Sequence, residues 1–173
     1  MLFSTSPLSI KDHPADRLHC CGATRLGYRF IFLHATGGTN SLDWLSTTSP
    51  VSKPVSCHRH IAKDGTISKI VPDDKTAYTQ GPAEIGPLPS HTQNANNWSL
   101  SIEMENLDNG RDPWPAAQVR SCALQVVEWW GLYGFIPVVA HAWMQADKHD
   151  PEGFPWTEFY KLCWDQLKVI ATR

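Results

Sequence analysis

The residue types best suited to chemistry gather in one short stretch near the C-terminus. Residues 140–151 (AHAWMQADKHDP) hold two histidines, two aspartates and one lysine, directly after the apolar run at 136–139. Imidazole and carboxylate groups are common ligands of divalent metals, and a polar loop after a buried strand can present them together. This loop is therefore a candidate metal site, with His141 and Asp150 as two of its ligands.

A third ligand is expected from the end of another strand. Residues 28–34 (YRFIFLH) are aromatic or aliphatic at most positions, which is typical of a strand buried on both faces. The segment ends in His34, and a glycine-containing loop follows. Neighbouring strand ends would bring His34 beside His141, and two imidazoles with one carboxylate leave the open fourth position of catalytic zinc. For either histidine alone, an ordinary core or surface position remains the alternative.

Two further residues have the chemistry to move protons and to stabilise charge. Residues 98–105 (WSLSIEME) alternate between apolar and polar side chains, so Glu103 lies on the polar face of an expected strand. A carboxylate there can act as a general base. Lys148, two residues before Asp150, can stabilise a developing oxyanion. The alternatives are a solvated carboxylate on an edge strand and a solvated loop lysine.

The remaining pattern predicts the elements that position these residues. A hairpin is expected at 55–71 with its turn at 63–65, and strands at 98–105 and 136–140. Helices are expected after Asn40, from Pro115 to Gly134, and from Trp156 onward. Residues 1–27 are polar and irregular and read as an N-terminal arm. The prediction is a single α/β domain at 28–173, with a mixed central sheet flanked by helices and a zinc site at strand ends.

Composition excludes several classes of function. A chain of 173 residues with a formal charge of -2 and no run of lysine or arginine gives no reason to expect nucleic acid as a partner. No apolar stretch approaches a membrane span, and the N-terminus lacks the pattern of a signal peptide, so we expect a cytoplasmic protein. We also expect a monomer. Five cysteines without a repeated spacing argue against a disulfide framework. Eight tryptophans would suit the faces of sugars or peptides.

Several short motifs together resemble one family, the zinc-dependent N-acetylmuramoyl-L-alanine amidases. This family includes phage lysins, muropeptide amidases and peptidoglycan recognition proteins. The matching segments are FIFLHATGG at 30–38, VSCH at 55–58 before KDGTI at 63–67, VPDD at 71–74, WSLSIEMEN at 98–106, and 141–151 followed by FPW at 154–156. They occur in the family's order and cover roughly residues 28 to 160.

The resemblance implies a role for each matched residue. Zinc would bind His34, His141 and Asp150, while Glu103 would be the general base and Lys148 would assist the transition state. His58 matches a histidine that lines the substrate groove, and a packed hairpin residue is its alternative.

The chain also departs from the family pattern. Residues 78–81 read YTQG where the family often has WHAG, which puts the substrate contacts there in doubt. Cys57 stands where some lysins have a functional tyrosine, which gives Glu103 more weight. Trp143 stands where an aspartate is common, and it either stacks on substrate or packs. His60 and His149 match no catalytic position and are expected at the surface.

The function implied by the resemblance is hydrolysis of peptidoglycan. The enzyme would cut the amide between N-acetylmuramic acid and the L-alanine of the stem peptide, with peptidoglycan or muropeptides as its partner. A phage endolysin that reaches the wall after release fits best. The alternatives are a non-catalytic peptidoglycan-binding domain, a cytoplasmic amidase that recycles muropeptides, and a different zinc amidohydrolase.

Overall fold

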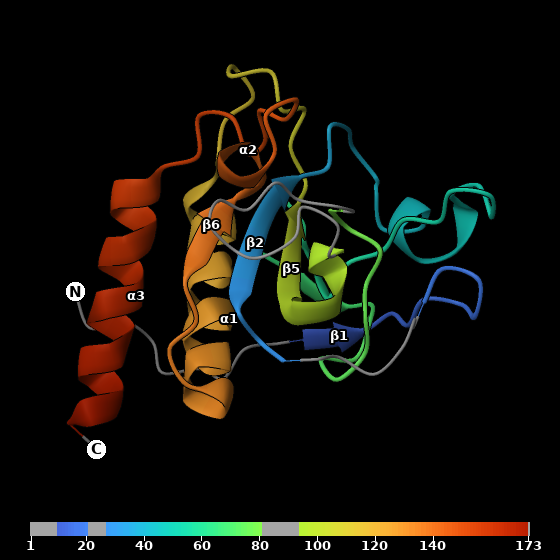
Figure 1. Ribbon diagram of the computed structural model, residues 1–173. Coiled ribbons are helices and arrows are strands. Elements are labelled where there is room, and N and C mark those ends of the chain that lie inside the picture. The colour runs from blue at the N-terminus through green and yellow to red at the C-terminus, as the bar shows by residue number, and fades with distance from the viewer. Residues whose placement is uncertain (1–9, 21–26, 81–93, 173) are drawn as a thin grey trace.

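The computed structural model describes residues 10–20, 27–80 and 94–172, which form a six-stranded mixed sheet with helices packed on it (Figure 1). The strand order is β1-β4-β3-β5-β2-β6. The strands are β1 Ile10–Asp12, β2 Phe30–Ala35, β3 Arg59–Ile61, β4 Ile67–Lys69, β5 Ser99–Met104 and β6 Val138–Ala140. The helices are α1 Ala116–Tyr133, α2 His141–Met144 and α3 Trp156–Ala171. The predicted fold class is confirmed.

The antiparallel part of the sheet is the predicted hairpin of β3 and β4, and the other strand pairs are parallel. Two hydrogen bonds close its turn. Ala62 N donates to Thr66 O at 3.0 Å, and Thr66 N donates to the side-chain Oδ1 of Asp64 at 2.8 Å. Gly65 adopts a φ of +87°, and a Cβ there would lie 2.8 Å from the Ala117 carbonyl oxygen of α1. Glycine at the turn therefore serves both the backbone conformation and the close approach of a helix.

One face of the sheet is covered by α1 and α3 (Figure 1). Ile31 and Leu33 of β2 point to this face and are fully buried in the cluster that contains both helices. The amide of Gln118 on α1 donates to the carbonyls of Ile61 and Glu105 at 3.0 and 2.9 Å, which ties the helix to β3 and to the end of β5. As predicted, α1 begins after Pro115 and ends at Gly134, whose φ is +81°.

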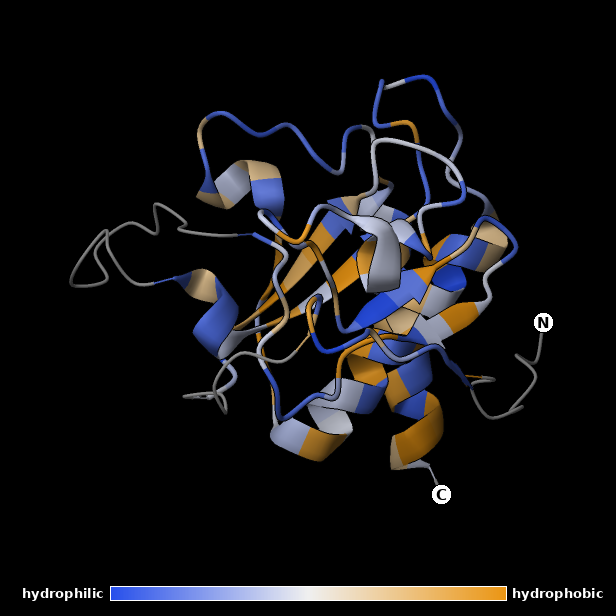
Figure 2. Cartoon of the chain, turned by 90° about the vertical axis from the view of Figure 1, so that its right-hand side faces the viewer, coloured by the Kyte–Doolittle hydropathy of each residue, from blue (hydrophilic) through white to orange (hydrophobic). Residues whose placement is uncertain are grey.

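The opposite face of the sheet carries the alternate side chains and is both aromatic and polar. Phe32 packs there with Ala95 and Trp98, next to a short 3-10 turn at Ala95–Trp98. Glu103 and the serines of β5 point to the same face, and all six residues of β5 are buried. Figure 2 shows the hydrophobic strands lying inside a surround of mostly hydrophilic loops. The carboxylate of Glu103 therefore lies in the interior, not on a wet edge strand.

Three local expectations are wrong. Ile10–Asp12, expected to be irregular, forms the edge strand β1 beside β4. The short helix expected after Asn40 is a π-helical turn at Trp44–Thr48, which begins after Asp43. The expectation against disulfides does not hold for Cys20, which is disulfide-bonded. Cys57, Cys122 and Cys163 are free and buried.

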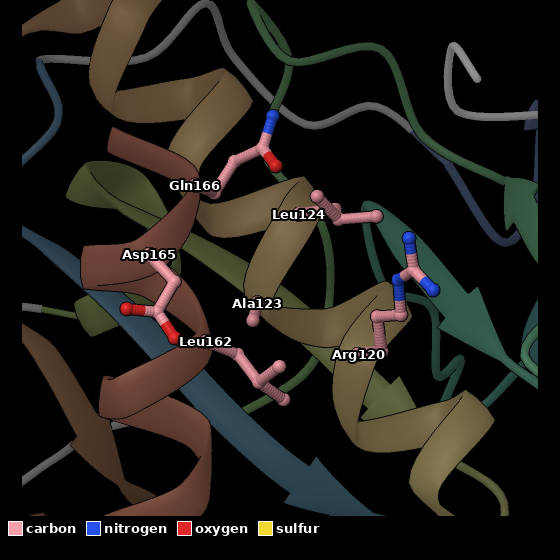
Figure 3. A pocket seen from close by; sticks show the side chains of 6 residues that line it. All are labelled: Arg120, Ala123, Leu124, Leu162, Asp165 and Gln166. Atoms are coloured by element: carbon pink, nitrogen blue, oxygen red, sulfur yellow. The ribbon is translucent and has the colours of Figure 1, made fainter. Parts of the chain in front are cut away.

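A small pocket between α1 and α3 is unconnected with the strand ends. Its lining comprises Arg120, Ala123, Leu124, Leu162, Asp165 and Gln166 (Figure 3). The Asp165 carboxylate accepts from Lys161 Nζ at 3.0 Å, and no histidine or cysteine lines the pocket. The candidate chemistry therefore lies elsewhere. Within the described ranges, no helix has the length and apolar character needed to cross a membrane.

Candidate active site

The sheet register brings the predicted site residues together. β2 lies between β5 and β6, and His34 is the partner of Glu103 across the first of these pairs. On the other side Leu33 pairs with Ala140, so the next residues, His34 and His141, are also neighbours. All three strands are parallel, so their carboxyl ends meet at one edge, at the top of the sheet in Figure 1 beside α2.

Asp150 completes a compact cluster with the two histidines. Its Oδ2 lies 3.0 Å from His34 Nδ1, and its Oδ1 lies 3.0 Å from His141 Nδ1. The two Nδ1 atoms are 3.1 Å apart, and all three residues are buried. A backbone bond from Ala142 N to Asp150 O, 2.9 Å long, closes the loop that returns the aspartate to the strand end.

The donor set of this cluster fits a zinc ion. Zinc bonds to nitrogen or oxygen of about 2.0–2.1 Å in a tetrahedron place neighbouring ligand atoms about 3.3 Å apart. With Asp150 Oδ2 as the oxygen ligand, the three ligand atoms lie 3.0, 3.1 and 3.2 Å apart, which is close to that value. In the described part of the chain, this is the group of histidine and acidic residues arranged to hold a metal ion.

Burial and hydrogen bonding act in opposite directions on the cluster. Burial raises the pKa of Asp150, but the hydrogen bonds and charges of both imidazoles outweigh it, so that this pKa lies below its usual range. Burial lowers the pKa of His34, and the hydrogen bond to Asp150 only partly opposes this effect. The cluster therefore favours an ionised Asp150 carboxylate beside a neutral His34 imidazole, which are the forms of these two groups that bind a metal.

Glu103 lies next to the cluster in a state suited to a proton carrier. Its side chain is 7 % exposed, and its Oε2 has no hydrogen-bond partner among the residues that the structure describes. Burial, followed by the negative charges of Asp150 and Asp108, raises the pKa of Glu103 well above its usual value. A carboxyl group whose pKa is raised above its usual value holds a proton more readily, which suits a group that must both take and return one.

The rest of the loop holds Lys148 at the surface. Its backbone N donates to Gln145 O at 3.1 Å, and its side chain is exposed two residues before Asp150. His149 is 70 % exposed, as expected, and its Nε2 pairs with Asp108 Oδ2 at 3.1 Å. Asp108 Oδ1 also accepts a hydrogen bond from Glu152 N at 2.8 Å. Asp108, in the segment after β5, therefore contacts residues that lie before and after Asp150 in the sequence, His149 and Glu152.

His58 lies on the same face of the sheet as Glu103. Its Nδ1 is 2.9 Å from Ser101 Oγ, its Nε2 is 3.1 Å from Lys75 O, and the residue is 1 % exposed. Contact with a substrate would require one of these bonds to open, so a groove role for His58 stays a prediction. His60, expected at the surface, is 3 % exposed, because β3 lies inside the sheet.

Trp143 is an exposed aromatic residue close in sequence to His141 of the candidate metal site. It follows His141 by two residues on α2, and its ring stacks on Trp156 with centroids 4.5 Å apart. With 57 % of the residue still exposed, the stack fixes the ring without covering it. The structure therefore combines the two alternatives, because Trp143 packs on one neighbour and remains open to another.

Sequence reasoning missed the two glutamines of the site. Gln145 Oε1 lies 2.9 Å from His141 Nε2, and the only sequence signal was its place four residues after a candidate ligand on a short helical turn. Gln80 is buried, and its amide nitrogen donates to Ser99 Oγ. It belongs to the YTQG segment that departs from the family pattern, of which Gly81 lies outside the described residues.

The sequence matches the model of the N-acetylmuramoyl-L-alanine amidase family over residues 24–153. The chain belongs to this family. The name of the family states the bond that its members cut, and the match contains His34, Glu103, His141 and Asp150. Comparison with curated protein sequences gave no match.

Solved structures of amidases share the fold. A selenomethionine derivative of AmpD superimposes with a TM-score of 0.75 and 22% identity, over 94% of this chain and 99% of that one. The amidase LysC from Clostridium intestinale URNW gives a TM-score of 0.66 and 17% identity, over 89% and 95%. AmiD from E. coli, solved with anhydro-N-acetylmuramic acid-L-Ala-D-gamma-Glu-L-Lys, gives 0.64 and 21%, over 78% and 57%.

Proposed function

We propose that this amidase is zinc-dependent and cuts the amide between N-acetylmuramic acid and the L-alanine of the stem peptide. His34, His141 and Asp150 would hold the metal, with Glu103 and Lys148 as the catalytic residues. The observation that carries the proposal is the convergence of two Nδ1 atoms and one carboxylate, 3.0–3.1 Å apart, at a strand end beside Glu103.

Bound zinc supplies a Lewis acid that polarises a carbonyl group and makes a water molecule acidic. Glu103 takes a proton from the attacking water and later delivers it to the departing amine of L-alanine. Its raised pKa supports the second step, because the protonated carboxyl persists long enough to act as an acid. Lys148 brings an ammonium group to the oxyanion that forms at the scissile carbonyl. This role requires the exposed side chain to turn toward the substrate.

Trp143 and His58 are the proposed substrate contacts. The open face of Trp143 can pack on the apolar face of a sugar ring or on the stem peptide, as an indole fixed from behind by Trp156. His58 would line the substrate groove, and its contact with substrate would replace its bond to Ser101 or to Lys75. Both roles predict changes in KM rather than in metal content.

The biological role that we propose is that of a phage endolysin, active on the cell wall after release from the cytoplasm. The likeness to the endolysin amidase LysCS from Clostridium intestinale, with a TM-score of 0.66, supports this role. Recycling of soluble muropeptides is the second candidate, and the likeness to AmpD and to AmiD with its anhydromuropeptide supports it.

The test uses two substrates and one metal-free control. Protein treated with chelator, the same protein with zinc restored, and untreated protein are each incubated with intact sacculi and with soluble anhydromuropeptides. We expect zinc-dependent release of new L-alanine amino termini from both, and faster release from sacculi if the enzyme is an endolysin. Faster release from soluble fragments alone would favour recycling. Binding to sacculi without any release, with or without zinc, would refute catalysis and leave a binding domain.

A further inference from the structure

The two ring nitrogens of His141 have different partners. Nδ1 faces the cluster, 3.0 Å from Asp150 Oδ1, whereas Nε2 points away from it and lies 2.9 Å from Gln145 Oε1. Carboxylate and amide oxygens only accept hydrogen bonds, so each contact is served by a proton on the nitrogen that faces it. Binding a metal through Nδ1 requires the lone pair on that atom, so the proton of the neutral ring then lies on Nε2, where Gln145 Oε1 accepts it.

Local backbone structure holds Gln145 in place to make this contact. α2 is a single helical turn that starts at His141, and Gln145 N donates to His141 O at 3.1 Å to close it. Residues four apart on a helical turn lie on the same side, which brings the two side chains together. Lys148 N donates to Gln145 O, so the main chain of Gln145 is bound on both sides. His141 is 5 % exposed, so little water competes for Nε2.

His34 has no equivalent support. Its Nε2 is buried and makes no hydrogen bond of good geometry within the described ranges. The ring instead lies against Phe32, with centroids 6.0 Å apart and planes 18° apart. Packing therefore orients one ligand, and a hydrogen bond orients the other.

We propose that Gln145 is a positioning residue for the metal site, which fixes the tautomer and orientation of His141 so that Nδ1 is free to bind zinc. The inference rests on the proposed zinc dependence. Hydrogen-bond partners behind metal-binding histidines typically change metal affinity by about 10- to 100-fold when they are removed. Gln145→Leu should weaken zinc binding by that factor, because leucine has a similar volume but no acceptor. Gln145→Glu should restore affinity, because a carboxylate also accepts from Nε2.

The experiment measures the Kd for Zn²⁺ of the metal-free full chain by competition with a chromophoric chelator. Gln166→Leu, in the pocket between α1 and α3, is the matched control and should bind zinc like the wild type. A second readout is the ¹H–¹⁵N NMR spectrum of the imidazoles in the zinc-loaded wild type and in zinc-loaded Gln145→Leu. The Nε2 proton of His141 should exchange slowly with solvent in the wild type and faster in Gln145→Leu, which offers no acceptor for it.

The outcomes separate this inference from the proposed function. If the wild type binds no zinc, zinc dependence itself fails. If the wild type binds zinc and Gln145→Leu binds it equally well, the role of Gln145 is refuted and the zinc site stands. A wild-type spectrum in which the His141 Nε2 proton exchanges as fast as that of an exposed imidazole would also overturn the role of Gln145, even if the leucine variant failed to fold.

Discussion

Replacing Glu103 by glutamine tests the catalytic assignment most directly. Glutamine has nearly the same volume as glutamate, so no cavity forms at a position that is 7 % exposed. The change removes the only property on which the proposal depends, which is a carboxyl group whose pKa burial and the charges of Asp150 and Asp108 raise. Fold and zinc content should therefore survive, while turnover falls.

The expected size of the loss follows from the role of Glu103. A positioned general acid–base group contributes about 10²- to 10⁴-fold, which is about 3 to 5 kcal/mol of transition-state stabilisation. Glu103 would act in both proton transfers, so we expect the upper part of this range. The assay is the initial rate of release of L-alanine amino termini from sacculi, at equal zinc content measured by atomic emission.

Glu105→Gln is the matched control for this experiment. Glu105 follows Glu103 by two residues, so it points toward the same face, but its Oε1 accepts from Asn40 N at 3.1 Å, outside the metal cluster. This variant should keep its rate within a few-fold of the wild type. If Glu103→Gln, with full zinc and wild-type thermal stability, also released product within a few-fold of the wild-type rate, the assignment of Glu103 as the base would be wrong.

Four other changes have expected outcomes. Asp150→Asn removes the only charged ligand of the proposed site and should reduce zinc affinity by more than about 100-fold, measured by chelator competition. Loss of a hydrogen-bond partner behind a ligand costs about 10- to 100-fold in metal affinity, and loss of the ligand itself should cost more. Lys148→Ala should lower kcat by about 10²- to 10³-fold at unchanged zinc content. Trp143→Ala should raise KM for muropeptides without lowering Tm, because the ring is 57 % exposed. Asp73→Asn should lower the free energy of unfolding by about 3 kcal/mol near neutral pH, measured with urea, since Arg59 Nη1 lies 2.8 Å from Asp73 Oδ1 in a buried pair. Burial raises the pKa of Asp73, but the charge and hydrogen bonds of Arg59 lower it below its usual value. The wild-type advantage is therefore present above about pH 4 and should vanish as the pH falls through the lowered pKa.

The strand-end argument predicted that His34, His141 and Asp150 lie together because it depended on few unknowns. An aromatic and aliphatic run that ends in His34, and another that ends just before His141, predict two buried parallel strands, and such strands end at a common edge. The alternation in β5 likewise predicted the face on which Glu103 lies. These inferences use only local patterns, a continuous apolar run in the first case and the two-residue period of a strand in the second, which do not depend on distant parts of the chain.

The features that the sequence did not reveal depend on tertiary contacts. Alternation separates the two faces of β5 but does not say whether the polar face is wet, and here the strand lies fourth of six in the sheet order and is buried throughout. β1 has only three residues, one of them apolar, and its extended conformation follows from pairing with β4. The contact of Gln145 with His141 depends on a single helical turn that is too short to leave a periodic pattern.

Hydrophobic packing on one face of the sheet helps to orient the candidate catalytic side chains on the other face. Ile31 and Leu33 are fully buried against the helices, and full burial of such a side chain is worth about 1.5 to 3 kcal/mol. A slip of β2 by one residue would turn both toward the polar face and would turn His34 away from Asp150. Burial of these two side chains contributes about 3 to 6 kcal/mol to folding, and it does so in the register that places His34 between Glu103 and His141, although neither residue belongs to the site.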